Sequence, residues 1–184
     1  MPVIVESNTP LYEKDEWRTP PALFKLLNDE FRFHLDAAAS PDNTLCPRYF
    51  TEKDNALEQR WGDNGIRRIF CNPPFSMTKE FLAKGIQEYD SGGVESVFLI
   101  RADGYETAWF RQLMRQLTTG PYMQELQYQV RQLWPRVPYV LPDGTKPEHG
   151  PNFPSAAVVL FESYSRGMFW WNWKKEAEEK GYLK

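Results

Sequence analysis

The chain has 184 residues, a mass of 21.6 kDa and a formal net charge of −3. This length fits one domain that buries roughly 70% of the surface of its unfolded chain. The negative charge argues against a protein that coats nucleic acid non-specifically, because such proteins are strongly basic, but it still allows a specific DNA-binding protein.

Cellular location and metal content follow from the same composition. No apolar run reaches the roughly 20 residues that a membrane span needs, and the N-terminus has no signal-peptide pattern. Cys46 and Cys71 have neither metal-ligand nor disulfide-framework spacing, and His34 and His149 are the only histidines. We therefore expect a cytoplasmic protein without a metal site and without a membrane contact.

The first elements in the chain are an arm and a helix. Residues 1–16 are polar, and we expect an arm that lies on the surface or is partly disordered, followed by a single domain over residues 17–184. Thr19 followed by two prolines predicts a capped helix from about Pro20 to Phe31.

Asp36 ends the next predicted element. Residues 33–36 alternate apolar and polar side chains, and three alanines follow. In open α/β sheets ligands bind beyond the carboxyl ends of the strands, and small residues there let a ligand approach the backbone. Asp54 is a second acid that we expect at a strand end beside the strand that leads to Asn72. The alternative for both acids is that they cap a turn or a helix.

A stiff loop follows the apolar residues 69–71. It consists of Asn72, Pro73, Pro74 and Phe75, and the two prolines fix their own φ angles and restrict the residue before them. The Asn72 carboxamide and the Pro73 carbonyl can accept hydrogen bonds from an exocyclic amino group, while the Phe75 ring offers a face to a flat base. The alternative is an ordinary turn after a buried strand.

The remaining elements alternate between helices and strands. The pattern predicts helices over 76–89 and 107–117, buried strands over 94–100 and 156–161, and a charged helix at the end of the chain. Residues 118–154 are rich in glycine and proline, and we expect a small hairpin or loop insertion there. The alternation indicates an α/β domain with a mostly parallel central sheet flanked by helices.

Several segments carry a family resemblance that runs from Glu16 to Phe161. The chain resembles the bacteriophage-type DNA adenine-N6-methyltransferases, the phage Dam-like family. The matching segments include Trp17-Arg18-Thr19-Pro20, Leu35-Asp36-Ala37-Ala38, Asn72-Pro73-Pro74-Phe75-Ser76, Arg101-Ala102-Asp103 and Pro154-Ser155-Ala156.

The resemblance implies a Rossmann-like class I methyltransferase fold that binds S-adenosylmethionine. It implies that Asn72 to Phe75 form the catalytic motif and that Asp36 and Ala37 contact the methionine end of the cofactor. Asp54 would contact the adenosine, and the cofactor carboxylate would lie near Trp17, Thr19 and Pro20. Three alanines stand where the wider class has a glycine-rich turn.

The implied substrate is an adenine that is flipped out of double-stranded DNA, since a base within the duplex cannot reach such a pocket. Glutamine pairs with adenine and arginine with guanine in the major groove, so the residues expected to contact DNA are Arg111, Arg115, Gln127, Arg131 and Arg136. The alternative for these residues is a solvated helix face. Related motifs act on RNA or on a protein glutamine amide, and a non-catalytic phage DNA-binding module is a further alternative. The sequence leaves the oligomeric state open, and a monomer is consistent with it.

Overall fold

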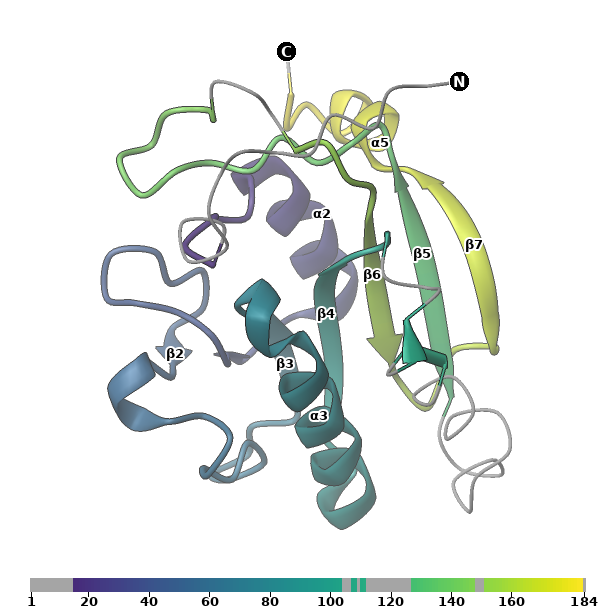
Figure 1. Ribbon diagram of the computed structural model, residues 1–184. Coiled ribbons are helices and arrows are strands. Elements are labelled where there is room, and N and C mark those ends of the chain that lie inside the picture. The colour runs from purple at the N-terminus through teal and green to yellow at the C-terminus, as the bar shows by residue number, and fades with distance from the viewer. Residues whose placement is uncertain (1–14, 104–106, 109, 112–126, 148–150, 184) are drawn as a thin grey trace.

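A seven-stranded sheet organises the computed structural model (Figure 1), which describes residues 15–103, 107–108, 110–111, 127–147 and 151–183. The strand order is β2-β1-β3-β4-β6-β5-β7, and four of the six strand pairings are parallel. This confirms the expected Rossmann-like, mostly parallel α/β architecture. The strands are β1 (Leu35–Asp36), β2 (Arg48–Tyr49), β3 (Arg68–Cys71), β4 (Glu95–Arg101), β5 (Tyr128–Trp134), β6 (Ser155–Leu160) and β7 (Gly167–Asn172).

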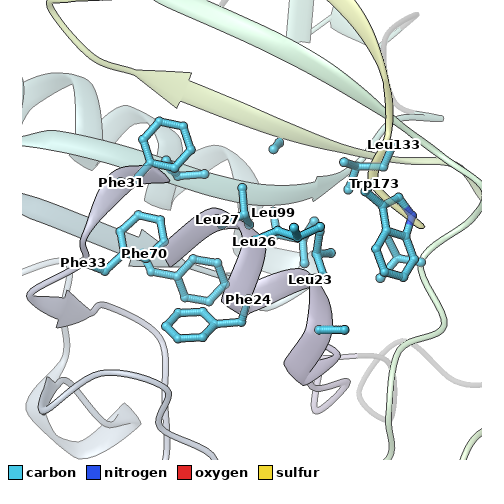
Figure 2. Packing of buried hydrophobic residues seen from close by; sticks show 14 of the residues in the cluster. Leu23, Phe24, Leu26, Leu27, Phe31, Phe33, Phe70, Leu99, Leu133 and Trp173 are labelled. Atoms are coloured by element: carbon cyan, nitrogen blue, oxygen red, sulfur yellow. The ribbon is translucent and has the colours of Figure 1, made fainter. Parts of the chain in front are cut away.

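Helices cover both faces of the sheet. The helix α2 (Pro21–Phe31) packs on one face together with α5 (Trp173–Glu179), and α3 (Thr78–Gly92) packs on the other. Strand β4 alternates between the two cores, with Val97 and Leu99 facing α2 and Phe98 and Ile100 facing α3. Figure 2 shows the leucines and phenylalanines of α2 gathered against the sheet and Trp173. The central strands β3, β4 and β6 are therefore buried on both sides, as their apolar residues predict.

The start of α2 differs from the expectation. Pro20 occupies the cap position without a side-chain hydrogen bond, and Pro21 is the first helical residue. The cap expected from Thr19 is therefore wrong, because the Thr19 hydroxyl is buried and has no hydrogen-bond partner among the described residues. A proline at the first position needs no partner for an N–H that it lacks, so the helix starts without that cap.

The middle of the expected 118–154 insertion is a strand of the sheet. β5 lies between β6 and β7, where it buries Gln129 and Gln132 to below 10% exposure. These two glutamines and Arg131 interrupt the apolar pattern, which is why the sequence did not predict a strand. The turn at residues 142–144 is confirmed, since Leu141 and Thr145 are joined by a backbone hydrogen bond of 2.8 Å.

The carboxyl ends of the strands meet at one edge of the sheet. Asp36 and Asn72 lie at strand ends, as expected, and because β1 and β3 pair in parallel their strands are neighbours. Asp54 does not: it belongs to the 3₁₀ turn η1 (Glu52–Asp54), and its carboxylate accepts hydrogen bonds from the Thr51 amide (2.8 Å) and hydroxyl (2.7 Å). The strand-end position expected for Asp54 is therefore wrong, and the capping alternative is correct.

Candidate active site

A cavity of about 450 Å³ opens at the carboxyl edge of β1 and β3, next to Asn72 and Pro74. A second cavity of about 40 Å³ is lined by Trp17, Thr19 and Asp36. Six residues line both cavities, so the two adjoin: Asp15, Glu16, Arg18, Ala38, Asn43 and Asn72.

Asn72 presents an acceptor at this junction. Its Nδ2 atom donates a hydrogen bond of 2.9 Å to the Trp17 carbonyl. Because a carbonyl oxygen can only accept, the amide group must face Trp17 with its nitrogen, and Oδ1 points elsewhere. Oδ1 is buried and has no hydrogen-bond partner among the described residues. A buried acceptor without a partner is costly, so a ligand that donates an N–H would satisfy it.

Phe75 begins the short 3₁₀ turn η2 (Phe75–Met77) and is half-buried. Its ring meets three aromatic rings almost at right angles, with centroid distances of 5.3 Å to Phe153, 5.9 Å to Tyr139 and 6.3 Å to Trp17. This edge-to-face packing fixes the plane of the ring. Phe75 does not line the larger cavity, which Pro74 reaches.

Arg101, at the end of β4, lies over the same aromatic group. Its guanidinium is 4.3 Å from the Phe153 centroid and 5.8 Å from the Phe75 centroid. Nε donates a hydrogen bond of 3.0 Å to Asp103, with which Arg101 forms an ion pair. A flat cation therefore covers part of the aromatic surface beside the Asn72 loop.

Asp36 is only 3% exposed. Burial raises the pKa of its carboxyl from 3.8 to about 6, although hydrogen bonds from the backbone amides of Ala38 and Leu45 favour the charged form. A carboxylate whose charge is disfavoured by burial gains from a nearby cation, so this residue suits the ammonium group of a ligand.

Three donor groups near the smaller cavity have no partner. The Trp17 Nε1, Arg18 Nε and Thr19 Oγ1 atoms are buried without a hydrogen bond from the described residues, and all three residues line that cavity. Unsatisfied buried donors are uncommon and suit an anionic group such as a carboxylate.

Two side-chain contacts hold the entry segment over the site. Asp15 accepts hydrogen bonds from the Ser76 amide (3.0 Å) and hydroxyl (2.6 Å). Arg18 pairs with Asp42 at 2.5 Å, and its backbone forms a bridge with Val140. The segment before α2 is thus tied to the loop after β3 and to the loop after β5.

The structure brings together most of the residues expected to bind the cofactor. Trp17, Thr19 and Asp36 line the smaller cavity, and Ala37 lines the larger one. Pro20 and Asp54 line neither. The sequence did not predict the cavity-lining carboxylates Asp15, Glu16, Asp42 and Glu52. The one signal in the sequence was the position of Glu16 next to Trp17, a residue expected to bind the cofactor.

The residues expected to contact DNA are dispersed. Arg111 and Arg136 are exposed and Gln127 is half-buried, whereas Arg115 lies outside the described residues. Arg131 is engaged within the protein: its two terminal nitrogens donate hydrogen bonds of 2.7 and 2.6 Å to Glu30, and it lies over the rings of Phe31, Tyr164 and Trp171. These contacts pack β5 against α2, and a contact of Arg131 with DNA stays a prediction.

Two kinds of feature are absent from the parts of the chain that the structure describes. No helix there is long and apolar enough to cross a membrane. The same residues contain no group of three or more His, Cys, Asp or Glu side chains placed to hold a metal ion.

Comparison with known proteins identifies relatives in bacteriophages. A DNA N-6-adenine-methyltransferase of Escherichia phage T1 is 33% identical over 105 residues, which cover 56% of this chain and 42% of the phage protein. A DNA N-6-adenine-methyltransferase of Haemophilus phage HP1 is 28% identical over 162 residues, covering 87% of this chain and 86% of that protein.

Among solved structures, a type I restriction-modification methyltransferase subunit from Streptococcus thermophilus aligns with a TM-score of 0.46 at 12% identity, over 81% of this chain and 45% of that one. The family model described as DNA N-6-adenine-methyltransferase (Dam) matches residues 6–182. The chain therefore belongs to the DNA N-6-adenine-methyltransferase family.

Proposed function

We propose that this protein transfers a methyl group from S-adenosylmethionine to the exocyclic N6 amino group of an adenine flipped out of double-stranded DNA. The observation that carries the proposal is the unpartnered Oδ1 atom of Asn72, at the end of β3 and at the junction of two cavities. The family match and the phage relatives support the same activity.

The cavities fit the cofactor in size and in chemistry. A volume of about 450 Å³ falls within the roughly 300–1,000 Å³ of small-molecule sites. The buried carboxyl of Asp36 would hold the ammonium group, and the unpartnered donors of Trp17, Arg18 and Thr19 would hold the carboxylate of the methionine end. The roles proposed for Asp36, Trp17 and Thr19 are those that the family resemblance implied, whereas Arg18 replaces Pro20 among the groups near the carboxylate.

Asn72 would hold the acceptor amine. When bound, S-adenosylmethionine supplies an electrophilic methyl group. Asn72 Oδ1 accepts one N–H of the adenine amino group, and the Pro73 carbonyl accepts the other. As positive charge develops on the amine nitrogen, two fixed acceptors stabilise it, and they need no reorganisation because Trp17 holds the amide and the prolines stiffen the loop.

The aromatic group beside this loop would receive the flipped base. Phe75 packs nearly at right angles to Trp17, Tyr139 and Phe153, and its ring would provide a stacking surface for the base. Arg101 lies over the rings of Phe75 and Phe153, so it must move or share that surface when a base stacks there.

Incubation with methyl-labelled S-adenosylmethionine and unmethylated double-stranded DNA, followed by nucleoside analysis, tests the proposal. We expect the label in N6-methyladenine. RNA and a glutamine-containing protein are included as competing substrates under the same conditions. Label in either of these and none in DNA would overturn the substrate assignment, and label in none of the three would overturn the activity.

A further inference from the structure

We propose that the active site selects the cationic cofactor over its neutral product by charge, and that Glu16 is the main determinant of this selection. The inference rests on the proposed function. S-adenosylmethionine carries a sulfonium charge that S-adenosylhomocysteine lacks, while the two molecules share their ammonium, carboxylate and adenosine groups. Any difference in affinity therefore reports the surroundings of the sulfur atom.

The lining of the larger cavity is strongly negative. Among the described residues it contains the carboxylates of Asp15, Glu16, Asp42 and Glu52 and one guanidinium, that of Arg18. Arg18 is paired with Asp42, so one cation and one anion offset each other. Asp15 is half-buried, whereas Glu16, Asp42 and Glu52 are exposed, so their charges face solvent as well as the cavity. A concave site lined by charges of one sign still attracts a cation, and added salt weakens this attraction.

The carboxylates differ in what already binds them. Asp15 accepts two hydrogen bonds from Ser76. Glu16 and Glu52 have no ion pair or side-chain hydrogen bond with the residues that the structure describes. Their charges are available to a ligand.

Position then separates Glu16 from Glu52. Glu16 lines both cavities together with Asn72, whereas Glu52 lines only the larger one. For methyl transfer the reacting atoms must approach to roughly 3–3.5 Å, so the sulfonium lies beside the amine that Asn72 holds. Glu16 is thus the unpaired carboxylate at the reacting end of the site.

Methyl transfer removes the charge that this arrangement binds. The acceptor nitrogen would gain the methyl group and lose a proton to water, and the sulfur would leave as a neutral thioether that keeps the electron pair of its broken bond to the methyl group. The product then lacks the attraction of Glu16 and leaves more readily than the cofactor. Weak product inhibition is the functional consequence.

Binding of three small molecules to the full chain tests the proposal by calorimetry. S-adenosylmethionine and sinefungin, which carries an ammonium in place of the sulfonium, are expected to bind about tenfold more tightly than S-adenosylhomocysteine at low salt. Glu16→Gln should reduce that ratio to about threefold or less, with Glu52→Gln having a smaller effect. Glu58→Gln, which removes an exposed charge outside the cavity, should leave it unchanged, and circular dichroism should show the same fold for all variants.

The outcomes are distinguishable. Equal affinity of the unmodified chain for all three molecules would overturn the charge selection and leave the proposed function intact. A tenfold ratio that Glu16→Gln does not reduce would overturn the role of Glu16. If none of the three molecules binds, the proposed function itself fails.

Discussion

Asn72 combines two hydrogen-bonding roles that its carboxamide alone can fill: the nitrogen donates to the Trp17 carbonyl, and the oxygen faces the site. We predict that Asn72→Ala lowers kcat at least about a hundredfold, the usual effect of removing a preorganised polar contact to a transition state. Cofactor affinity should stay within about threefold. Single-turnover methylation and calorimetry on the same preparations measure the two effects.

Asn72→Asp is the matched control, because it keeps an acceptor but places a carboxylate oxygen against the Trp17 carbonyl. We expect activity between those of the wild type and the alanine variant. If Asn72→Ala weakens cofactor binding as much as it slows turnover, then Asn72 has a structural role and no specific role in the reaction.

Asp36 makes cofactor binding depend on pH. Because burial raises the pKa of its carboxyl to about 6, the free protein holds a neutral acid below that pH and a carboxylate above it. We predict that affinity for S-adenosylmethionine falls about tenfold per pH unit below 6 and is flat above 7, since the cofactor ammonium needs the ionised form. Calorimetry between pH 5 and pH 8 measures how the affinity for S-adenosylmethionine changes with pH.

Asp36→Asn should bind S-adenosylmethionine weakly, with an affinity that does not change between pH 5 and pH 8. A flat profile for the unmodified chain would contradict the role of Asp36 in binding the cofactor ammonium.

Asp36 also makes the stability of the fold depend on pH, in the opposite direction to an ion-paired acid. With a folded-state pKa raised above 3.8, the carboxyl favours folding below that pH, and this contribution is lost as the pH rises through about 6.

The packing of α3 on β4 is the tightest contact between two elements next to the site. A Cβ atom at Gly85 would lie 2.4 Å from Phe98 Cζ, and Phe98 is fully buried. We predict that Gly85→Ala lowers the free energy of unfolding by about 1–3 kcal/mol, the cost of overpacking a core. It should also lower activity, because α3 continues directly from the loop that carries Asn72.

Gly92→Ala tests whether this effect belongs to the contact. A Cβ at Gly92 meets its nearest neighbour at an ordinary 3.9 Å, so we expect a change within about 0.5 kcal/mol. Urea denaturation of both variants provides the comparison. Helix propensity alone favours alanine over glycine, so a loss for Gly85→Ala that is no larger than that for Gly92→Ala would contradict the role of the contact with Phe98.

Strand β5 is joined to α2 by Arg131, whose guanidinium binds Glu30. Burial raises the pKa of Glu30, but the hydrogen bonds and charge of Arg131 outweigh it, so the net shift is downward. We predict that Arg131→Ala costs about 2–3 kcal/mol of stability, since it leaves Glu30 partly buried without its cation. The stabilisation is present at neutral pH and is lost as the pH falls below 4.5 through the folded-state pKa of Glu30. Urea denaturation and DNA binding are measured together, and unchanged stability with weakened DNA binding would contradict this role.

At the scale of the whole molecule, the sequence predicted the elements whose residues follow a regular local pattern. It identified α2, α3, β4 and β6, and it placed Asp36 and Asn72 at strand ends. It did not predict β5, because buried glutamines and a paired arginine break the apolar pattern, and their burial depends on partners distant in sequence.

The residues that line the cavity could not be predicted from local sequence pattern for the same reason. Glu16 and Glu52 lie in segments that only the tertiary fold brings to one cavity, and the bridge between Arg18 and Val140 joins residues far apart in the chain. The apolar residues 69–71 nevertheless correctly predicted a strand that ends just before Asn72. Motif residues are predictable because their spacing is local, whereas the charges around them are set by the fold.

The net charge of the molecule sets how it can bind DNA. With 22 Lys and Arg against 25 Asp and Glu, the chain as a whole repels a polyanion, so binding must depend on a few local cations. Arg136 is exposed and follows the carboxyl end of β5, the same edge as Asn72. We predict a shallow dependence of DNA affinity on salt, with a slope of log K against log salt smaller than about 5.

Arg136→Ala should weaken binding and reduce that slope by about 1, the effect of losing one phosphate contact. Arg67→Ala is the matched control, because Arg67 is also exposed but precedes β3 and so lies at the opposite edge of the parallel strands. Fluorescence anisotropy of labelled DNA at four salt concentrations gives both slopes. An equal reduction for the two variants would mean that DNA does not approach the molecule at the edge where Asn72 lies.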